Sequence, residues 1–275
     1  MQLNIRLFLF IFLCTGLILT AIAAETSPAR RIVSLAPDLT EWLYAIDSGQ
    51  YIIGVAKGSD YPDAVKNIPI VASYNTLNSE AILALHPDLI IAWSGTPPAQ
   101  LQLLRELHLP VYVSHIQSLM DIPRTLQELG HLVGKEAAAH EAAQVFLARY
   151  QELQKKYART KKVRVLYEIS ADPLMTINKT SWINEIITLC GGVNIFADST
   201  GIAPKISEEA VVLLNPDVIL MDQNISSWQA EWQNWRNLKA VQTHHLFSLN
   251  GDWVERAGPR ILKGIESVCK DLEQG

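Results

Sequence analysis

Two stretches of the chain carry one pattern: SEAILALHPDLII at residues 79–91 and EEAVVLLNPDVIL at residues 208–220. Six aligned positions are identical, and most of the others exchange one apolar residue for another. Each copy predicts a short helix, a turn at a Pro-Asp pair and then a buried strand. This order of elements is common in α/β proteins, but the identities favour duplication of a lobe. Two similar lobes would enclose a cleft, and such clefts bind small ligands.

Outward from these copies, apolar runs alternate with helical stretches. Strands are expected within residues 31–37, 51–55, 109–113, 163–169 and 241–249. Asp38 or Thr40 is expected to cap the helix after the first strand, with Glu41 in its first turn. Alternation of this kind favours parallel sheets built from βα units. We therefore predict an α/β fold of two similar Rossmann-like lobes with parallel sheets.

Residues 135–162 separate the two copies. The segment is rich in Ala, Glu, Gln, Leu and Lys and contains neither Gly nor Pro. Its apolar residues recur at helical spacing, which predicts one rigid helix of about six or seven turns. A flexible linker would be rich in Gly and Ser instead. The predicted division is a signal peptide at 1–24, an N-terminal lobe at 25–134, a bridging helix at 135–162 and a C-terminal lobe at 163–275.

The N-terminus has the layout of a secretory signal peptide. Arg6 precedes an almost wholly apolar run at residues 7–22, and small residues follow at 21–24. A retained membrane anchor is the alternative. Removal of the signal peptide takes Cys14 away and leaves Cys190 and Cys269. An even pair in an oxidising compartment indicates one disulfide, whereas two unrelated buried thiols are the alternative.

Composition and motifs exclude several classes of protein. The net charge is −5 without a basic block, so the chain lacks the electrostatic footprint of nucleic-acid binding. The sequence contains no G-x-S-x-G, H-E-x-x-H, Walker A or dinucleotide motif. Glu168 and Asp172 lie four residues apart without a signal for a third catalytic group. We predict a protein that is not an enzyme and has no catalytic cofactor; an adhesin-like interaction module is a further alternative.

Aromatic residues follow several of the expected strands. Ligands of α/β proteins gather beyond the carboxyl ends of the strands, where rings offer flat apolar area. In the segment 252–260, carboxylate and guanidinium groups can hydrogen-bond amides or carboxylates, although a local ion pair also explains them. The candidate ligand-binding residues are Tyr61, Tyr74, Trp93, Asp252, Trp253 and Arg256.

One acidic residue stands at the same place in each copy of the repeat. Glu80 and Glu209 both fall early in their helices, where the helix dipole favours a carboxylate. That local effect is sufficient to explain them. The functional interpretation is that each lobe presents one charge to a partner with two-fold symmetry.

Three further motifs give the chain a family resemblance: RIVSLAP at 31–37, CGGVNIF at 190–196 and DWVERAGPR at 252–260. Together with the repeat, they resemble the cobalamin-binding receptors of ABC importers, within the helical-backbone, class III solute-binding proteins. The resemblance covers essentially the whole mature chain. It implies a monomeric periplasmic receptor that holds a corrinoid edge-on between two lobes and delivers it to membrane permease subunits.

The same resemblance assigns roles to residues. The six candidate ligand-binding residues would contact the corrinoid, except that Tyr74 stands where tryptophan is usual. Glu80 and Glu209 would dock onto arginines of the permease, and Cys190 and Cys269 match a family disulfide. No metal ion is expected in the cobalamin interpretation.

Two departures from the family pattern keep a second ligand open. Glu168 lies near a position that carries phenylalanine, and Ala203 stands where tryptophan is expected. Related haem receptors place an iron-ligating tyrosine in the loop that holds Tyr74, and tyrosinate is a sound ligand for ferric haem. Haem is therefore the alternative ligand, followed by a ferric siderophore.

Overall fold

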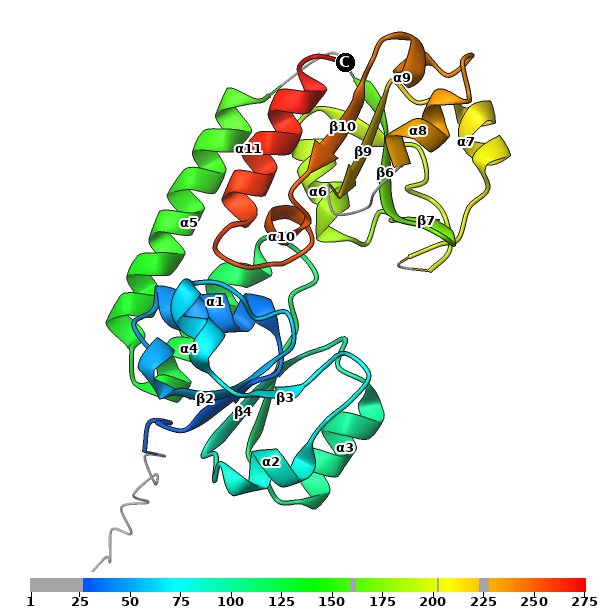
Figure 1. The fold of residues 1–275 in the computed structure, drawn as a ribbon. Helices are drawn as coiled ribbons and strands as arrows, with labels where there is room; N and C mark the ends of the chain where they lie inside the picture. Colours follow the sequence, from blue (N-terminus) through cyan, green and yellow to red (C-terminus); the bar gives the residue numbers. More distant parts are fainter. Residues whose placement is uncertain (1–26, 159–161, 202, 223–227) are drawn as a thin grey trace, which may run out of the picture.

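The protein consists of two α/β lobes joined by one long helix (Figure 1). The computed structural model describes residues 27–158, 162–201, 203–222 and 228–275. The predicted signal peptide at 1–24 lies outside the described residues. Among the described helices, none is long and apolar enough to cross a bilayer.

The N-terminal lobe is a parallel sheet with helices on both sides. Its strand order is β3-β2-β1-β4-β5, and every neighbouring pair is parallel. The strands are β1 (Ile32–Ser34), β2 (Ile52–Ala56), β3 (Ile70–Ala72), β4 (Leu89–Trp93) and β5 (Val111–Ser114). The helices are α1 (Pro37–Ala45), α2 (Ser79–Ala84), α3 (Pro98–Glu106) and α4 (Asp121–Val133), with 3₁₀ turns at Gly49–Tyr51 and Asp63–Asn67.

The C-terminal lobe has a mixed sheet. Its order is β10-β9-β6-β7, and β8 also pairs with β6. The strands are β6 (Val163–Ala171), β7 (Leu174–Thr176), β8 (Gly192–Asn194), β9 (Val218–Asp222) and β10 (Leu246–Leu249). The helices are α6 (Trp182–Leu189), α7 (Glu208–Leu214), α8 (Trp228–Gln233), α9 (Lys239–Gln242), α10 (Gly251–Val254) and α11 (Ile261–Leu272).

The prediction of parallel sheets was wrong for one strand. β7 runs antiparallel to β6, and Ala171 pairs with Leu174. Only two residues connect these partners, and such a short connection permits only an antiparallel hairpin because a parallel pair needs a long crossover.

The duplicated pattern has the same structural role in both lobes. The carboxylate of Asp88 accepts the backbone N–H of Arg31 at 2.8 Å, where β1 begins. In the second lobe, the carboxylate of Asp217 accepts the backbone N–H of Arg164 at 2.7 Å, where β6 begins. β1 then pairs in parallel with β4, as β6 does with β9. The Pro-Asp turn therefore fixes the first strand of each lobe beside the strand that follows the turn.

The helix α1 begins differently from the prediction. Neither Asp38 nor Thr40 caps it, because the helix starts at Pro37 and no side chain accepts a bond at its N-cap position. Proline suits the first helical position, where its missing N–H has no partner to lose. The Thr40 hydroxyl instead lies 3.0 Å from the carbonyl oxygen of Ala36 and 2.8 Å from the Ser34 hydroxyl. The cap prediction was wrong because it placed the N-cap two or four residues after Ala36, the residue that precedes the helix.

The long helix between the lobes is α5 (Glu136–Lys156), with 21 residues. Its buried side chains lie at Ala139, Ala143, Phe146 and Leu153, a spacing that keeps them on one face. Arg149 pairs with Glu266 of α11 at 2.8 Å. Packing along its length, against α4 and α11, makes α5 a rigid connection rather than a free linker.

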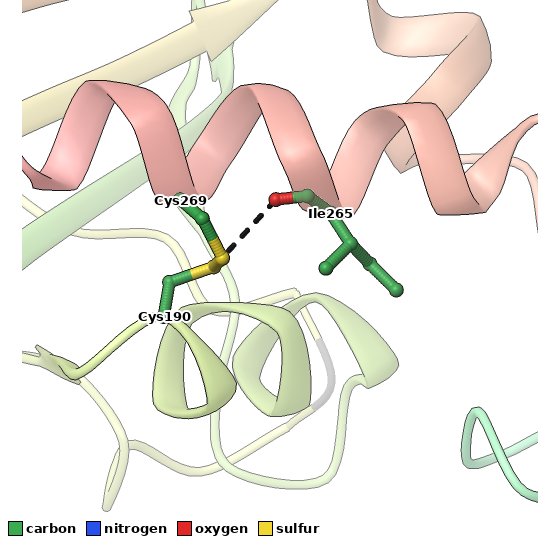
Figure 2. Close-up of a disulfide and its surroundings, with 3 residues drawn as sticks. All are labelled: Cys190, Ile265 and Cys269. Atoms are coloured by element: carbon green, nitrogen blue, oxygen red, sulfur yellow. Dashed lines mark hydrogen bonds between the residues drawn. A yellow bond between two sulfur atoms is a disulfide. The ribbon is translucent and has the colours of Figure 1, made fainter. Parts of the chain in front are cut away.

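A disulfide joins Cys190 to Cys269, as predicted (Figure 2). It connects the end of α6 to α11 with a Cα–Cα distance of 4.7 Å and a sequence separation of 79 residues. The Cys190 sulfur lies 3.6 Å from the carbonyl oxygen of Ile265. Both cysteines are fully buried, so the bond is part of the core between these helices.

Candidate ligand-binding site

A cleft of about 260 Å³ lies between the two lobes. The N-terminal lobe supplies residues that follow β1, β2, β3 and β4, and the C-terminal lobe supplies the start of α6 and the segment after α10. The cleft is therefore at the carboxyl ends of the strands, where α/β sheets bind ligands. Its described lining residues are Leu35, Ala36, Pro37, Asp38, Ala56, Lys57, Ala72, Ser73, Tyr74, Trp93, Thr96, Pro97, Gln100, Trp182, Glu255, Arg256 and Ala257.

Three of the six candidate residues line this cleft: Tyr74, Trp93 and Arg256. The two rings are unusually open for side chains of their size, with 68% of Tyr74 and 36% of Trp93 exposed. The side-chain amide of Gln100 donates to the carbonyl oxygen of Tyr74 at 3.2 Å, which ties the Tyr74 loop to α3. Exposed rings on supported loops offer flat apolar area for a ligand.

The other three candidates lie outside the set of described lining residues. The guanidinium of Arg260 lies 4.4 Å from the centre of the Tyr61 ring. The Lys263 amine lies 5.8 Å from the centre of the Trp253 ring. Asp252 pairs with Arg256 at 2.6 Å. This contact is the local ion pair that the sequence analysis gave as the alternative explanation for the segment 252–260.

Arg256 belongs to a network of charges that joins the lobes. Besides Asp252, it contacts Asp60 at 2.9 Å and Glu41 at 3.5 Å. Arg260 binds the Glu41 carboxylate through two hydrogen bonds, of 2.9 and 2.7 Å. The Glu41 side chain is only 1% exposed. Paired bonds of this kind are strong and directional, so Glu41 fixes α1 against the segment that leads into α11.

The cleft is lined by two carboxylates and two cationic side chains, Arg256 and the exposed Lys57, and only the guanidinium of Arg256 is paired among the described residues. Asp38 and Glu255 line it, and the guanidinium of Arg256 already faces three carboxylates. Asp38 is half-buried, and desolvation raises the pKa of its carboxyl to about 6. The hydroxyl of Thr96 is buried without a hydrogen-bond partner within the described residues. These groups suit a ligand that brings its own N–H donors.

Comparison with known proteins agrees with this architecture. A family model described as periplasmic binding protein matches residues 32–252. The chain belongs to the periplasmic binding protein family. A vitamin B12-binding protein of Vibrio cholerae is 39% identical over 263 residues, which cover 94% of this chain and 95% of that one. A vitamin B12-binding protein of Vibrio parahaemolyticus is 34% identical over 259 residues, or 94% of each chain.

Solved structures extend the comparison. The crystal structure of the periplasmic vitamin B12 binding protein of Vibrio cholerae matches with a TM-score of 0.84 at 39% identity, and covers 90% of this chain and 97% of that one. A periplasmic heme-binding protein from Roseiflexus matches with a TM-score of 0.78 at 22% identity, covering 88% and 97%. The second likeness shows the shared fold alone.

The sequence did not point to several lining residues of this periplasmic binding protein. Trp182 begins α6, and its indole N–H donates to the carbonyl oxygen of Val254 at 3.0 Å. Ser181 caps that helix by accepting the N–H of Ile183 at 3.2 Å. The sequence could have indicated Trp182, because it directly follows Ser181, a typical helix-capping residue. Thr96 gave no signal, because nothing in the sequence reveals whether a hydroxyl has a partner.

The two departures from the family pattern do not belong to the described lining of the cleft. Glu168 is buried in β6, and the indole N–H of Trp232 donates to its carboxylate at 2.6 Å. Desolvation raises the pKa of Glu168 to about 7. Ala203 is exposed. Neither residue is among the described lining residues. Glu168 therefore belongs to the polar packing between β6 and α8.

The two repeat acids are exposed at corresponding places in the lobes. Glu80 lies in the first turn of α2 and Glu209 in the first turn of α7. Asn78 and Ser207 cap these helices, each by accepting the backbone N–H three residues ahead. Other side chains make these caps, although the Glu209 carboxylate also bonds its own backbone N–H and the Ser207 hydroxyl, which lowers its pKa.

No group of three His, Cys, Asp or Glu side chains within the described ranges could hold a metal ion. A haem iron would take a single axial ligand from the protein, and Tyr74 is the cleft residue with a suitable oxygen.

Proposed function

We propose that this periplasmic binding protein captures cobalamin in the cleft between its lobes and delivers it to an ABC importer. Its close curated relatives and its structural neighbour from Vibrio cholerae are named vitamin B12-binding proteins. A receptor of this kind binds and releases its solute unchanged. We further propose that it acts as a monomer after export and removal of residues 1–24.

The chemistry of the cleft supports cobalamin over haem as the ligand. Cobalamin presents a broad ring system edged with amide groups, whereas haem carries two carboxylates. Trp93 and Tyr74 suit a broad ring system, and Asp38 and Glu255 can accept amide N–H groups. Arg256 is already surrounded by carboxylates and is a poor partner for a propionate, so the exposed amine of Lys57 is the one described cleft cation open to a carboxylate, whereas haem brings two. The cleft therefore favours the amide-bearing ligand.

Haem remains a second candidate because of one residue. The side chain of Tyr74 lines the cleft, is 68% exposed and carries a phenol oxygen able to bind ferric iron. Tyr74→Phe separates the two ligands, because it keeps the ring and removes that oxygen. Cobalamin affinity should change little in this variant, whereas haem ligation through Tyr74 would be lost.

The deciding experiment titrates the mature protein with cyanocobalamin and, separately, with haemin, by calorimetry and absorbance. We expect one-to-one binding of cyanocobalamin and no tyrosinate-type spectrum with haemin. Trp93→Ala should weaken cobalamin binding, and Val145→Ala on the exposed face of α5 should not. Binding of haemin alone would overturn the proposal and move the function to haem uptake.

Delivery is tested separately from capture. We propose that Glu80 and Glu209 pair with basic residues of the permease subunits, one from each lobe. Replacing both by alanine should abolish cobalamin uptake in cells while leaving cobalamin affinity unchanged. Glu141→Ala, an exposed acid on α5, is the matched control. Normal uptake by the double variant would exclude this docking mode.

A further inference from the structure

The ring of Trp93 lies against the backbone of the turn that follows its own strand. Trp93 is the last residue of β4, and Gly95 comes two residues later in that turn. A Cβ atom at Gly95 would lie 2.6 Å from Cζ2 of the Trp93 ring and closer still to Cη2 and Cζ3. Carbon atoms in contact normally stay about 3.5–4.0 Å apart. The six-membered part of the indole thus occupies the space where any other residue would place its side chain.

The backbone at this position does not itself require glycine. The described glycines with positive φ are Gly58, Gly134, Gly191 and Gly201, and Gly95 is not one of them. A residue with a side chain can therefore adopt the backbone conformation of Gly95 without strain. The nearest obstacle to a side chain is the indole ring of Trp93. Gly95 therefore differs from glycines that are required by the backbone conformation of a turn.

We propose that Gly95 is the positioning residue for Trp93, and that the absence of a side chain there sets the shape of the ligand cleft. One side of the indole rests on the Gly95 backbone, while the ring lines the cleft and stays 36% exposed. A methyl group at position 95 displaces the ring from this position against the backbone. The cleft then loses a fixed flat surface, so it binds a broad planar ligand less well. The choice of cobalamin as the test ligand rests on the function proposed above.

The test is a double-mutant cycle with Gly95→Ala, Trp93→Ala and the variant that carries both. Gly95→Ala should weaken cyanocobalamin binding about tenfold, as expected when one aromatic contact is misplaced. In the Trp93→Ala background, the same change should have no further effect, because the ring that the methyl group displaces is gone. Ser94→Ala, an exposed neighbour in the same turn, is the matched control and should bind like the parent protein.

An equal loss of affinity from Gly95→Ala in both backgrounds would overturn the proposal. If Gly95→Ala alone fails to fold, the double variant still decides, since it should fold and bind like Trp93→Ala. A parent protein that binds haemin instead of cobalamin refutes the proposed function, and the same cycle is then run with haemin.

A second measurement needs no ligand. The near-ultraviolet circular dichroism contributed by Trp93, taken as the difference between variants with and without the indole, should change when Gly95 becomes alanine. An unchanged difference spectrum would show that the ring has not moved and would also overturn the proposal.

Discussion

Loss of the Glu41 carboxylate should destabilise the protein far more than loss of an ordinary surface charge. Glu41 is 1% exposed, and its partner Arg260 is 12% exposed. Glu41→Gln keeps the size of the side chain but leaves the guanidinium without its closest negative charge. Breaking a buried pair in this way costs about 3–5 kcal/mol. Because Asp252 lies 3.9 Å from Arg260 and compensates in part, we expect about 3 kcal/mol, the low end of that range.

Urea unfolding followed by circular dichroism measures this change. With a slope of about 2–3 kcal/mol per molar urea, the midpoint should fall by about 1 M. Asp198→Asn is the control, because its pair with Lys179 is exposed on both sides and should contribute nothing measurable. Adding Arg260→Met to Glu41→Gln should recover part of the loss, since no unpaired charge then remains buried. A midpoint equal to that of the control, or strictly additive losses, would refute the reasoning.

Three further changes follow from the same structure. Thr96→Val should weaken ligand binding severalfold in calorimetry without lowering the melting temperature, because the hydroxyl has no partner within the described protein to lose; unchanged affinity would exclude a ligand contact. Replacing Cys190 and Cys269 by alanine should destabilise the protein by about 4 kcal/mol, because the crosslink closes a 79-residue separation, and urea midpoints check this. Burial raises the pKa of Glu168 to about 7. Between its ordinary pKa and pH 7, the native state keeps the proton on this carboxyl whereas the unfolded chain releases it. The stability of the native state therefore falls as the pH rises through this range towards 7. The free energy of unfolding of Glu168→Gln minus that of the parent should therefore be more favourable to the variant at pH 8 than at pH 5. An equal difference at both pH values would contradict this account.

The sequence was sufficient for the repeated parts of the fold. The Pro-Asp turn could be predicted because proline restricts the backbone locally. The partner of its carboxylate could not, because the backbone N–H that it binds lies 57 residues earlier in the first lobe and 53 residues earlier in the second. The disulfide followed from counting cysteines in an exported chain. Features that depend on a few neighbouring residues, or on composition, can thus be predicted from the amino-acid sequence alone.

Other features depend on contacts between distant segments and were out of reach. Glu41 was expected only in the first turn of a helix, whereas its partner is 219 residues away. The start of α1 was placed too late because Pro37 competes with Asp38 and Thr40 as a start signal. Tyr61 and Trp253 follow strands as expected, yet each ring lies near a cationic side chain outside the described cleft lining. Aromatic residues at strand ends indicate a cleft without revealing which ring faces it.

The end of α10 and the segment after it are held by both lobes, and this limits how the cleft can open. From the N-terminal lobe, the indole N–H of Trp42 donates to the carbonyl oxygen of Ala257 at 2.7 Å. From the C-terminal lobe, the indole N–H of Trp182 donates to the carbonyl oxygen of Val254 at 3.0 Å. A wide rotation of the lobes would break one of these bonds or the buried Glu41–Arg260 pair. Since α5 also packs along its length, we expect ligand binding to use a largely preformed cleft, in which the position of the Trp93 ring and the hydroxyl of Thr96 matter more than closure of the lobes.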